Sequence, residues 1–357
     1  MPISDIRSTS EGSFAAAIAL AVLLLLAGFA LATSGFGHAL SDVVAMALAW
    51  AATLALAPFG FDLIRDGVEL RSALAGWAIR VSEVCDGIGL FVALTALILL
   101  RHRAAGSLTW RAVLGDIGLG FLAIQLFNLA RVVVLAVVLG TAPEWFDSTH
   151  AGLFPFLTFL LVTWLCLPRQ TLPLLWGLAA ALSLIWPFVA GPIGALLVAP
   201  ANLLLGLIAP LGIGTITPGA SGNFVVDTTF VASLDPVQLF VAPIRPADFL
   251  LAVPVLAVAA LLSRRIWPLA LALVAMALAL VCGALTASWA LAEAQAPLQV
   301  LRPDGAGAYI ATDYTVPALA QSLISVLQSS LVHLNYLVLP VLMLAAPSRR
   351  TKSHPDG

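Results

Sequence analysis

The stretch SEVCDGIGLFVALTALILLRHR, residues 82–103, decides how the rest of the chain is interpreted. In it a thiol, Cys85, precedes an apolar run from Ile88 to Leu100, and the basic sequence RHR at 101–103 closes that run. Basic residues concentrate on the cytoplasmic side of membrane proteins. The pattern therefore predicts a membrane span whose basic end lies inside and whose other end carries Cys85 at the outer face.

Composition predicts a membrane protein for the chain as a whole. Of its 357 residues, 61% are hydrophobic and only 10% are charged, with a mean hydropathy of +1.07. Soluble domains carry about 25% charged residues, so a soluble fold is excluded. The apolar runs are continuous, which favours transmembrane helices over the alternating strands of a β-barrel. With a net charge of −2 and no basic tract, we expect no binding of nucleic acid.

The expected fold is all-α, a polytopic transmembrane helical bundle. About nine spans are expected, near residues 13–33, 42–59, 87–100, 112–140, 151–167, 172–190, 247–263, 267–289 and 320–346. The 112–140 stretch is longer than one perpendicular span needs, so either a tilted helix or a helix broken near Asn128 is expected. Lys and Arg are concentrated in the short loops that this topology places in the cytoplasm.

Two regions between the spans carry patterns of their own. Residues 60–84 contain two short apolar runs around Ala75-Gly76, which predict a small outer-face hairpin before Cys85. The stretch NFVVDTTFVAS, 223–233, alternates like a strand within a segment, 191–246, expected to be re-entrant or interfacial and then an outer loop. Of the three cysteines, Cys166 and Cys282 lie inside apolar runs, where cysteine usually acts as a small hydrophobic residue. Neither a disulfide framework nor a CxxC motif is predicted.

Cys85 and Arg131 are candidates for chemistry. Cys85 lies at the N-terminal edge of a span, where the helix dipole favours a thiolate, although free cysteines are often only packing residues. Arg131 lies in the apolar stretch QLFNLARVVVLAVV, and a charge inside a membrane is costly unless it has a role or reaches the headgroups. Gln125, Asn128 and Arg131 are spaced by three residues, which places them near one helical face.

His150 is the third candidate. It ends the polar loop EWFDSTH, and an imidazole exchanges protons near neutral pH. The alternative is an interfacial histidine beside Trp145. In the predicted topology Cys85, Arg131 and His150 all reach the outer face. A thiol, a cation that stabilises an oxyanion and a base are the groups that acyl transfer requires.

These residues also carry a resemblance to a known family. The sequences VCDGIG at 84–89, NLAR at 128–131 and His150-Ala-Gly resemble, in order and placement, the motifs of the exosortase/archaeosortase family of integral membrane cysteine transpeptidases. The matching positions are Cys85, Gly87, Asn128, Arg131 and His150, within about residues 40–170. Arg65-Asp66-Gly67 also resembles the family. One departure is Asp86, where the family often has Ser, and an acid there opposes thiolate formation unless a cation pairs with it.

The resemblance implies a sorting enzyme of the cell inner (plasma) membrane, with its active site at the outer face. Its partners would be secreted proteins that carry a C-terminal tripartite signal: a short motif, a transmembrane helix and a basic tail. Cys85 would form the thioester, Arg131 would stabilise the oxyanion or position the substrate, and His150 would act as acid and base. Asn128, Asp86 and Gly87 would support them, and no metal or organic cofactor is implied.

The resemblance also suggests a division of the chain. We expect an N-terminal span over 1–36, an exosortase-like catalytic core over 37–190, and an additional C-terminal membrane region over 191–357.

Two other functions fit the same residues. In a polytopic transporter, Arg131 would bind an anionic substrate and Cys85 would be incidental. In a non-catalytic membrane scaffold, the polar residues would serve contacts between helices. The polar stripe of Gln321, Ser325 and Gln328 is best interpreted in that second way, as interhelical hydrogen bonding.

Overall fold

The structure is a computed structural model, and it describes residues 11–73, 76–81, 86–104, 109–208, 210, 212–218, 224–234, 237–244, 252–263, 266–294, 298–303 and 309–345. The chain divides into two compact units. The first comprises Met1–Trp176, Ala259–Arg265 and Leu337–Gly357, and the second comprises Gly177–Val258 and Ile266–Tyr336. The division predicted at residues 36 and 190 stays a prediction. Most described residues are helical, and two β-sheets accompany the helices.

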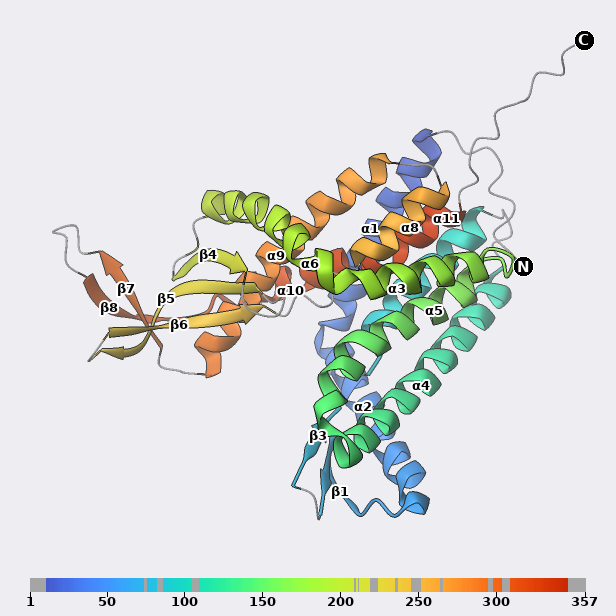
Figure 1. Cartoon of the computed structure of the whole chain (residues 1–357), viewed down its shortest axis with the longest axis horizontal. Helices are drawn as coiled ribbons and strands as arrows, with labels where there is room; N and C mark the ends of the chain where they lie inside the picture. The colour runs from blue at the N-terminus through green and yellow to red at the C-terminus, as the bar shows by residue number, and fades with distance from the viewer. Residues whose placement is uncertain are drawn as a thin grey trace, which may run out of the picture. The chain divides into compact units, whose positions relative to one another are not determined.

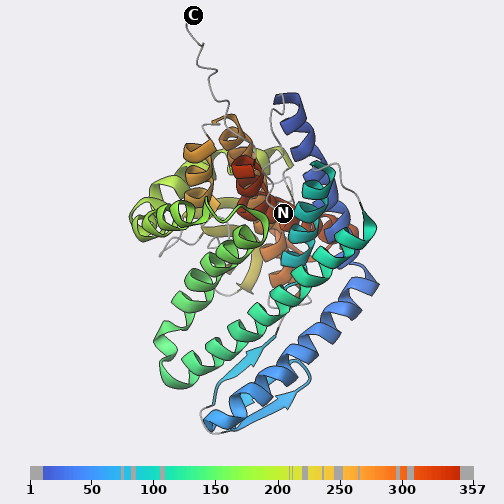
Figure 2. The ribbon, with the colours of Figure 1, turned by 90° about the vertical axis from the view of Figure 1, so that its right-hand side faces the viewer.

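Five helices form most of the first unit: α1 (Glu11–Ala32), α2 (Gly35–Leu56), α3 (Ile88–Ala104), α4 (Trp110–Thr141) and α5 (Phe154–Cys166). Short turns of helix follow α2 and α4: η1 (Ala57–Phe59), η2 (Pro143–Trp145) and η3 (Ser148–Leu153). Helix α3 packs against both α1 and α4, and α2 runs beside α4 (Figure 2). A Cβ added to Gly120 of α4 would lie 2.7 Å from Leu94 Cδ2 of α3, so glycine permits this close approach of the two helices.

A small antiparallel sheet lies between α2 and α3 in the chain. Its strands are β1 (Leu63–Asp66), β2 (Glu69–Ser72) and β3 (Ala78–Arg80), in the order β1-β2-β3. Leu70 and Val81 are almost fully buried against Ala49 of α2 and Val132 of α4. The hairpin expected around Ala75-Gly76 is therefore present as β2 and β3, and β1 extends it to three strands.

The second unit combines helices with a larger sheet. Helices α9 (Trp267–Ala294) and α10 (Ala318–His333) lie wholly in this unit. It also contains most of α6 (Leu172–Ile208), part of α8 (Ala252–Ser263) and the start of η5 (Leu334–Val338). The last helix, α11 (Leu339–Ala345), belongs to the first unit. Its five strands are β4 (Ile213–Pro218), β5 (Phe224–Leu234), β6 (Val237–Ile244), β7 (Leu298–Pro303) and β8 (Tyr309–Tyr314). Strand β5 pairs with β4, β6 and β7, and β8 pairs with β7 (Figure 1).

Side chains tie this second sheet to helices. The Asn202 amide of α6 donates to the Ile216 carbonyl at 2.8 Å and accepts from the Ile216 N–H at 2.7 Å. Phe230 and Val300 are fully buried together with Ala292 of α9. Helices α9 and α10 are joined by hydrogen bonds from Thr286 to Gln328 and from Gln321 to Glu293. The predicted interhelical role of the polar stripe is confirmed for Gln321 and Gln328.

The structure corrects three expectations about the fold. The chain is not all-α, because strands β4–β8 form a sheet, although β5 does coincide with the strand-like stretch at 223–233. Helix α4 is continuous over 32 residues, so a break near Asn128 is excluded. Helix α6 is likewise continuous over 37 residues, in place of a span that ends at 190 and a broken segment after it.

The expected count of nine spans is not confirmed. Among the described residues, seven helices are long and apolar enough to cross a membrane: Ser13–Ala32, Gly35–Phe59, Trp110–Thr141, Pro143–Cys166, Gly191–Ile208, Trp267–Glu293 and Ala318–Ala345. Helix α3 is apolar but only 17 residues long, and α8 is 12 residues long. These long apolar helices are compatible with a membrane protein.

Candidate active site

The carboxylate of Asp86 caps the start of α3. Its Oδ1 accepts a hydrogen bond from the Ile88 backbone N–H at 2.8 Å, and its Oδ2 accepts one from the Ser41 hydroxyl of α2. Asp86 is 1% exposed and Ser41 is 6% exposed. A negative charge at a helix N-terminus is stabilised by the helix dipole. The dipole that was expected to favour a thiolate therefore acts on this carboxylate as well.

Three helices meet at Asp86, because α4 contacts it too. The side-chain amide of Gln125 donates to the Asp86 carbonyl at 3.1 Å. Cys85 lies outside the described residues, but the peptide bond that follows it ends at Asp86. Asp86 is thus held by Ser41 of α2, by the first turn of α3 and by Gln125 of α4.

Sequence reasoning missed Ser41. The buried face of α2 consists of Gly37, Ser41, Ala45, Leu48, Ala49, Ala52 and Leu56. Among these residues Ser41 alone has a polar side chain. A single hydroxyl on an apolar helix face was the signal that could have identified it, since such groups in membrane helices usually have a hydrogen-bond partner.

Gly87 and Asn128 are in contact. Gly87 has a φ of +78°, a backbone conformation that residues other than glycine adopt only with strain. A Cβ at this position would lie 2.0 Å from Asn128 Nδ2 and 2.7 Å from Ile124 Cγ2. Both the backbone conformation and the space therefore require glycine. In this chain, the glycine at 87 thus leaves room for the Asn128 side chain.

Arg131 and His150 are also in contact, although 19 residues separate them. Arg131 Nη2 lies 3.0 Å from His150 Nε2, and since a guanidinium can only donate, Nε2 is the acceptor. The Phe154 ring lies 5.7 Å from Arg131 Cζ, and the Phe146 ring stacks on the imidazole with a centroid distance of 5.5 Å. His150 belongs to η3, a turn of π-helix, and π-turns are frequent at functional sites.

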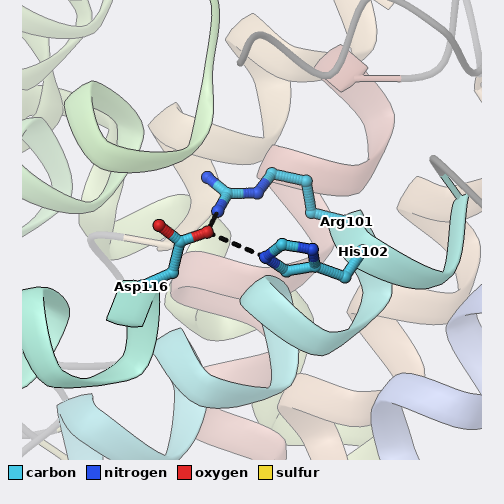
Figure 3. A network of polar contacts seen from close by, with 3 residues as sticks. All are labelled: Arg101, His102 and Asp116. Carbon is cyan, nitrogen blue, oxygen red and sulfur yellow. Dashed lines mark hydrogen bonds and ion pairs between the residues drawn. The ribbon is translucent and has the colours of Figure 1, made fainter. Parts of the chain in front are cut away.

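A second polar network ties α3 to α4 at the other end of α3. Arg101 and His102 of α3 both contact the Asp116 carboxylate of α4, with His102 Nε2 at 2.8 Å from Oδ2 (Figure 3). Arg101 lies 13 residues beyond Ile88, the first residue of α3, or about 20 Å along the helix axis. Asp116 is 38% exposed, so we expect the ion pairs to add little stability. They connect the last turn of α3 to the N-terminal part of α4.

Two further observations bear on chemistry. Among the described residues, no group of three or more His, Cys, Asp or Glu side chains is arranged to hold a metal ion. Gln125 Oε1, Asn128 Nδ2 and Arg131 Nε are buried, and none has a hydrogen-bond partner within the described part of the chain. The site thus has three pairs of neighbours: Asp86 with Gln125, Gly87 with Asn128, and Arg131 with His150.

A comparison with protein-family models, with curated proteins and with solved structures finds no match for this chain. The family interpretation therefore depends on the ordered motifs and on the contacts between them.

Proposed function

We propose that this chain is a membrane-embedded cysteine transpeptidase or protease of the exosortase/archaeosortase type. It cleaves C-terminal sorting signals of secreted proteins at the outer face of the inner membrane. The observation that supports this most is that Arg131 contacts His150 one helical turn from the contact between Asn128 and Gly87. Gly87, which takes part in the second contact, follows Cys85 by two residues in the sequence.

The proposed reaction is acyl transfer through a thioester. Cys85 Sγ attacks the scissile carbonyl carbon while His150 takes the thiol proton. The C–N bond then breaks, and His150 returns the proton to the leaving amine. An acceptor amine or water attacks the thioester next and gives its proton to His150. The C–S bond then breaks, and His150 passes that proton to the departing sulfur, which restores the thiol.

Arg131 supplies the positive charge that this pathway needs. In the structure its guanidinium donates to His150 Nε2, so the lone pair that a base requires is engaged. As the thiol attacks, the guanidinium turns from Nε2 to the developing oxyanion, which frees Nε2 to take the thiol proton. A charge-assisted donor aimed at an oxyanion typically contributes about 10²–10³ in kcat.

The substrate and the location follow from the same proposal. The partners are secreted proteins with a C-terminal tripartite signal, whose transmembrane helix lies in the same lipid bilayer. The basic end of α3, with Arg101, His102 and Arg103 in its last turn, faces the cytoplasm, and the Asp86 end faces outward. In the proposed reaction, every reacting group of the enzyme is a side chain of this protein: Cys85, Arg131 and His150.

The experiment that tests the proposal is substrate processing in cells. The chain is expressed with a secreted protein that carries a tripartite C-terminal signal, and the size of the substrate is followed by immunoblot. We expect Cys85→Ala to abolish cleavage. The matched control is Asp116→Asn, which alters the network at the far end of α3 and should leave cleavage intact. If Cys85→Ala processes the substrate as well as wild type does, the thiol mechanism fails, and Arg131 would then be tested as the anion site of a transporter.

A further inference from the structure

Helix α2 carries a single carboxylate on its exposed surface. Asp42 is exposed, and it is the only Asp, Glu, Lys or Arg of this helix. Large apolar side chains lie before and after it: Met46, one turn later, is 41% exposed, and Phe36 and Trp50 are 69% and 57% exposed. An exposed apolar surface on a helix of membrane length is one that lipid or another apolar helix covers. Asp42 is therefore a charge within an apolar contact surface.

The contacts of Ser41, the residue before Asp42, locate this charge along the helices. Ser41 binds the Asp86 carboxylate, and the Asp86 carbonyl accepts a hydrogen bond from Gln125 of α4. In α4, 15 residues precede Gln125 and 16 follow it, so more than about 20 Å of helix lies on each side. Asp42 thus lies near the level of the middle of α4, where a membrane-spanning helix is surrounded by hydrocarbon.

The Asp42 side chain forms no ion pair or hydrogen bond with any other described residue. His38, one turn earlier on the same helix, is also exposed, but no ion pair joins it to Asp42 within that part of the chain. A carboxylate in an apolar membrane environment is costly, and such residues usually pair with a cation. A cation brought by a partner would remove this cost.

We infer that the exposed face of α2 docks a transmembrane helix of another protein, and that Asp42 receives a lysine or arginine from that helix. The apolar part of such a helix matches the apolar surface, and its basic side chain neutralises the carboxylate. A second copy that packed through the same helix would bring two carboxylates together, since α2 contains no Lys or Arg. The inference is independent of the reaction proposed for Cys85.

The test measures the docking of two synthetic helices to the full chain in liposomes of phosphatidylcholine. Both are leucine-alanine peptides long enough to cross the bilayer, each with a benzophenone group and a dye, and they differ only in a central lysine or leucine. After illumination, the crosslinked fraction of the chain is read from the dye on a gel. We expect the lysine peptide to crosslink about tenfold more than the leucine peptide, with the crosslink on α2 by mass spectrometry.

The variant Asp42→Asn assigns that preference to the carboxylate. It removes the charge and keeps the side-chain shape, so the two peptides should crosslink equally. It should also unfold at the wild-type temperature, because no side-chain contact of Asp42 within the described residues is lost. The matched control is Asp116→Asn, which removes a carboxylate that already has partners on α3 and should leave the lysine preference unchanged.

Three results would overturn the inference. Equal crosslinking of the two peptides by the wild-type chain means that α2 receives no cation. A lysine preference that persists in Asp42→Asn assigns the preference to another group. A clearly lower unfolding temperature for Asp42→Asn assigns the carboxylate a role within the chain itself. None of these results depends on Cys85, so the proposed function stands or fails by its own experiment.

Discussion

Replacement of Gly87 by alanine is the substitution whose effect the structure defines most sharply. Alanine at this position meets two separate obstacles. Its backbone would have to keep a φ of +78°, and its Cβ would lie 2.0 Å from Asn128 Nδ2 and 2.7 Å from Ile124 Cγ2. Ordinary van der Waals contacts of a Cβ are 3.4–4 Å, so the side chains of α4 or the start of α3 must move.

The two obstacles have separate magnitudes. The left-handed conformation costs an L-residue about 1–2 kcal/mol, and overpacking of a close-packed site costs about 1–3 kcal/mol. Gly87→Ala should therefore destabilise the protein by about 2–5 kcal/mol. Removal of the Asn128 amide in the double variant Gly87→Ala/Asn128→Ala relieves the closer contact, so the two changes should couple by about 1 kcal/mol or more.

The assay is thermal unfolding of the purified full chain, with Cys85 modification by iodoacetamide as a second measurement. We expect Gly87→Ala to lower the unfolding temperature by about 5 °C or more. The control is Gly115→Ala on α4, where an added Cβ meets open space and alanine is the better helix former. An unfolding temperature for Gly87→Ala within about 1 °C of wild type would refute the assigned contact between Gly87 and Asn128.

Two further predictions concern stability. Ser41→Ala leaves the buried Asp86 carboxylate without its hydroxyl donor and should lower the free energy of unfolding by about 1.5–3 kcal/mol, measured by thermal unfolding. The control Ser322→Ala removes an exposed hydroxyl and should change the free energy of unfolding little. Equal effects of the two substitutions would contradict the assigned role of Ser41. Burial raises the pKa of the Tyr314 hydroxyl above its ordinary value near 10, while the hydrogen bond from Trp289 opposes this. Because the folded state holds that proton to higher pH than the unfolded state does, its stabilising effect is complete below pH 10 and is lost as the pH rises through the raised pKa. Tyr314→Phe should remove that alkaline loss in unfolding curves from pH 8 to 11, and a loss of the same size in the variant would assign it to another group.

The helices could be predicted from sequence because an apolar run long enough to cross a membrane almost always forms an α-helix. Helix α4 follows directly from the run at 112–140, and no proline lies within it. The second sheet could not be predicted in full. Strands β7 and β8 have six residues each and lie in a segment whose neighbours are helices, so only the longer alternation in β5 was recognisable.

The candidate site was predictable in its residue types but not in its contacts. The spacing of Gln125, Asn128 and Arg131 placed them on one helix face, and the structure agrees because α4 is regular there. The contact from Arg131 to His150 depends on the turn of π-helix after α4, for which no sequence signal was recognised. Ser41 was missed because its partner, Asp86, lies 45 residues away.

The central claim is that Cys85 carries the acyl group, and mass spectrometry of the trapped intermediate tests it most directly. The wild-type chain in liposomes is mixed with a substrate that carries a tripartite C-terminal signal, quenched in acid and digested. The account predicts that the peptide containing Cys85 gains the mass of the acyl fragment, that hydroxylamine removes this mass, and that Cys85→Ala neither gains it nor cleaves the substrate. Cleavage of the substrate by Cys85→Ala would contradict the account.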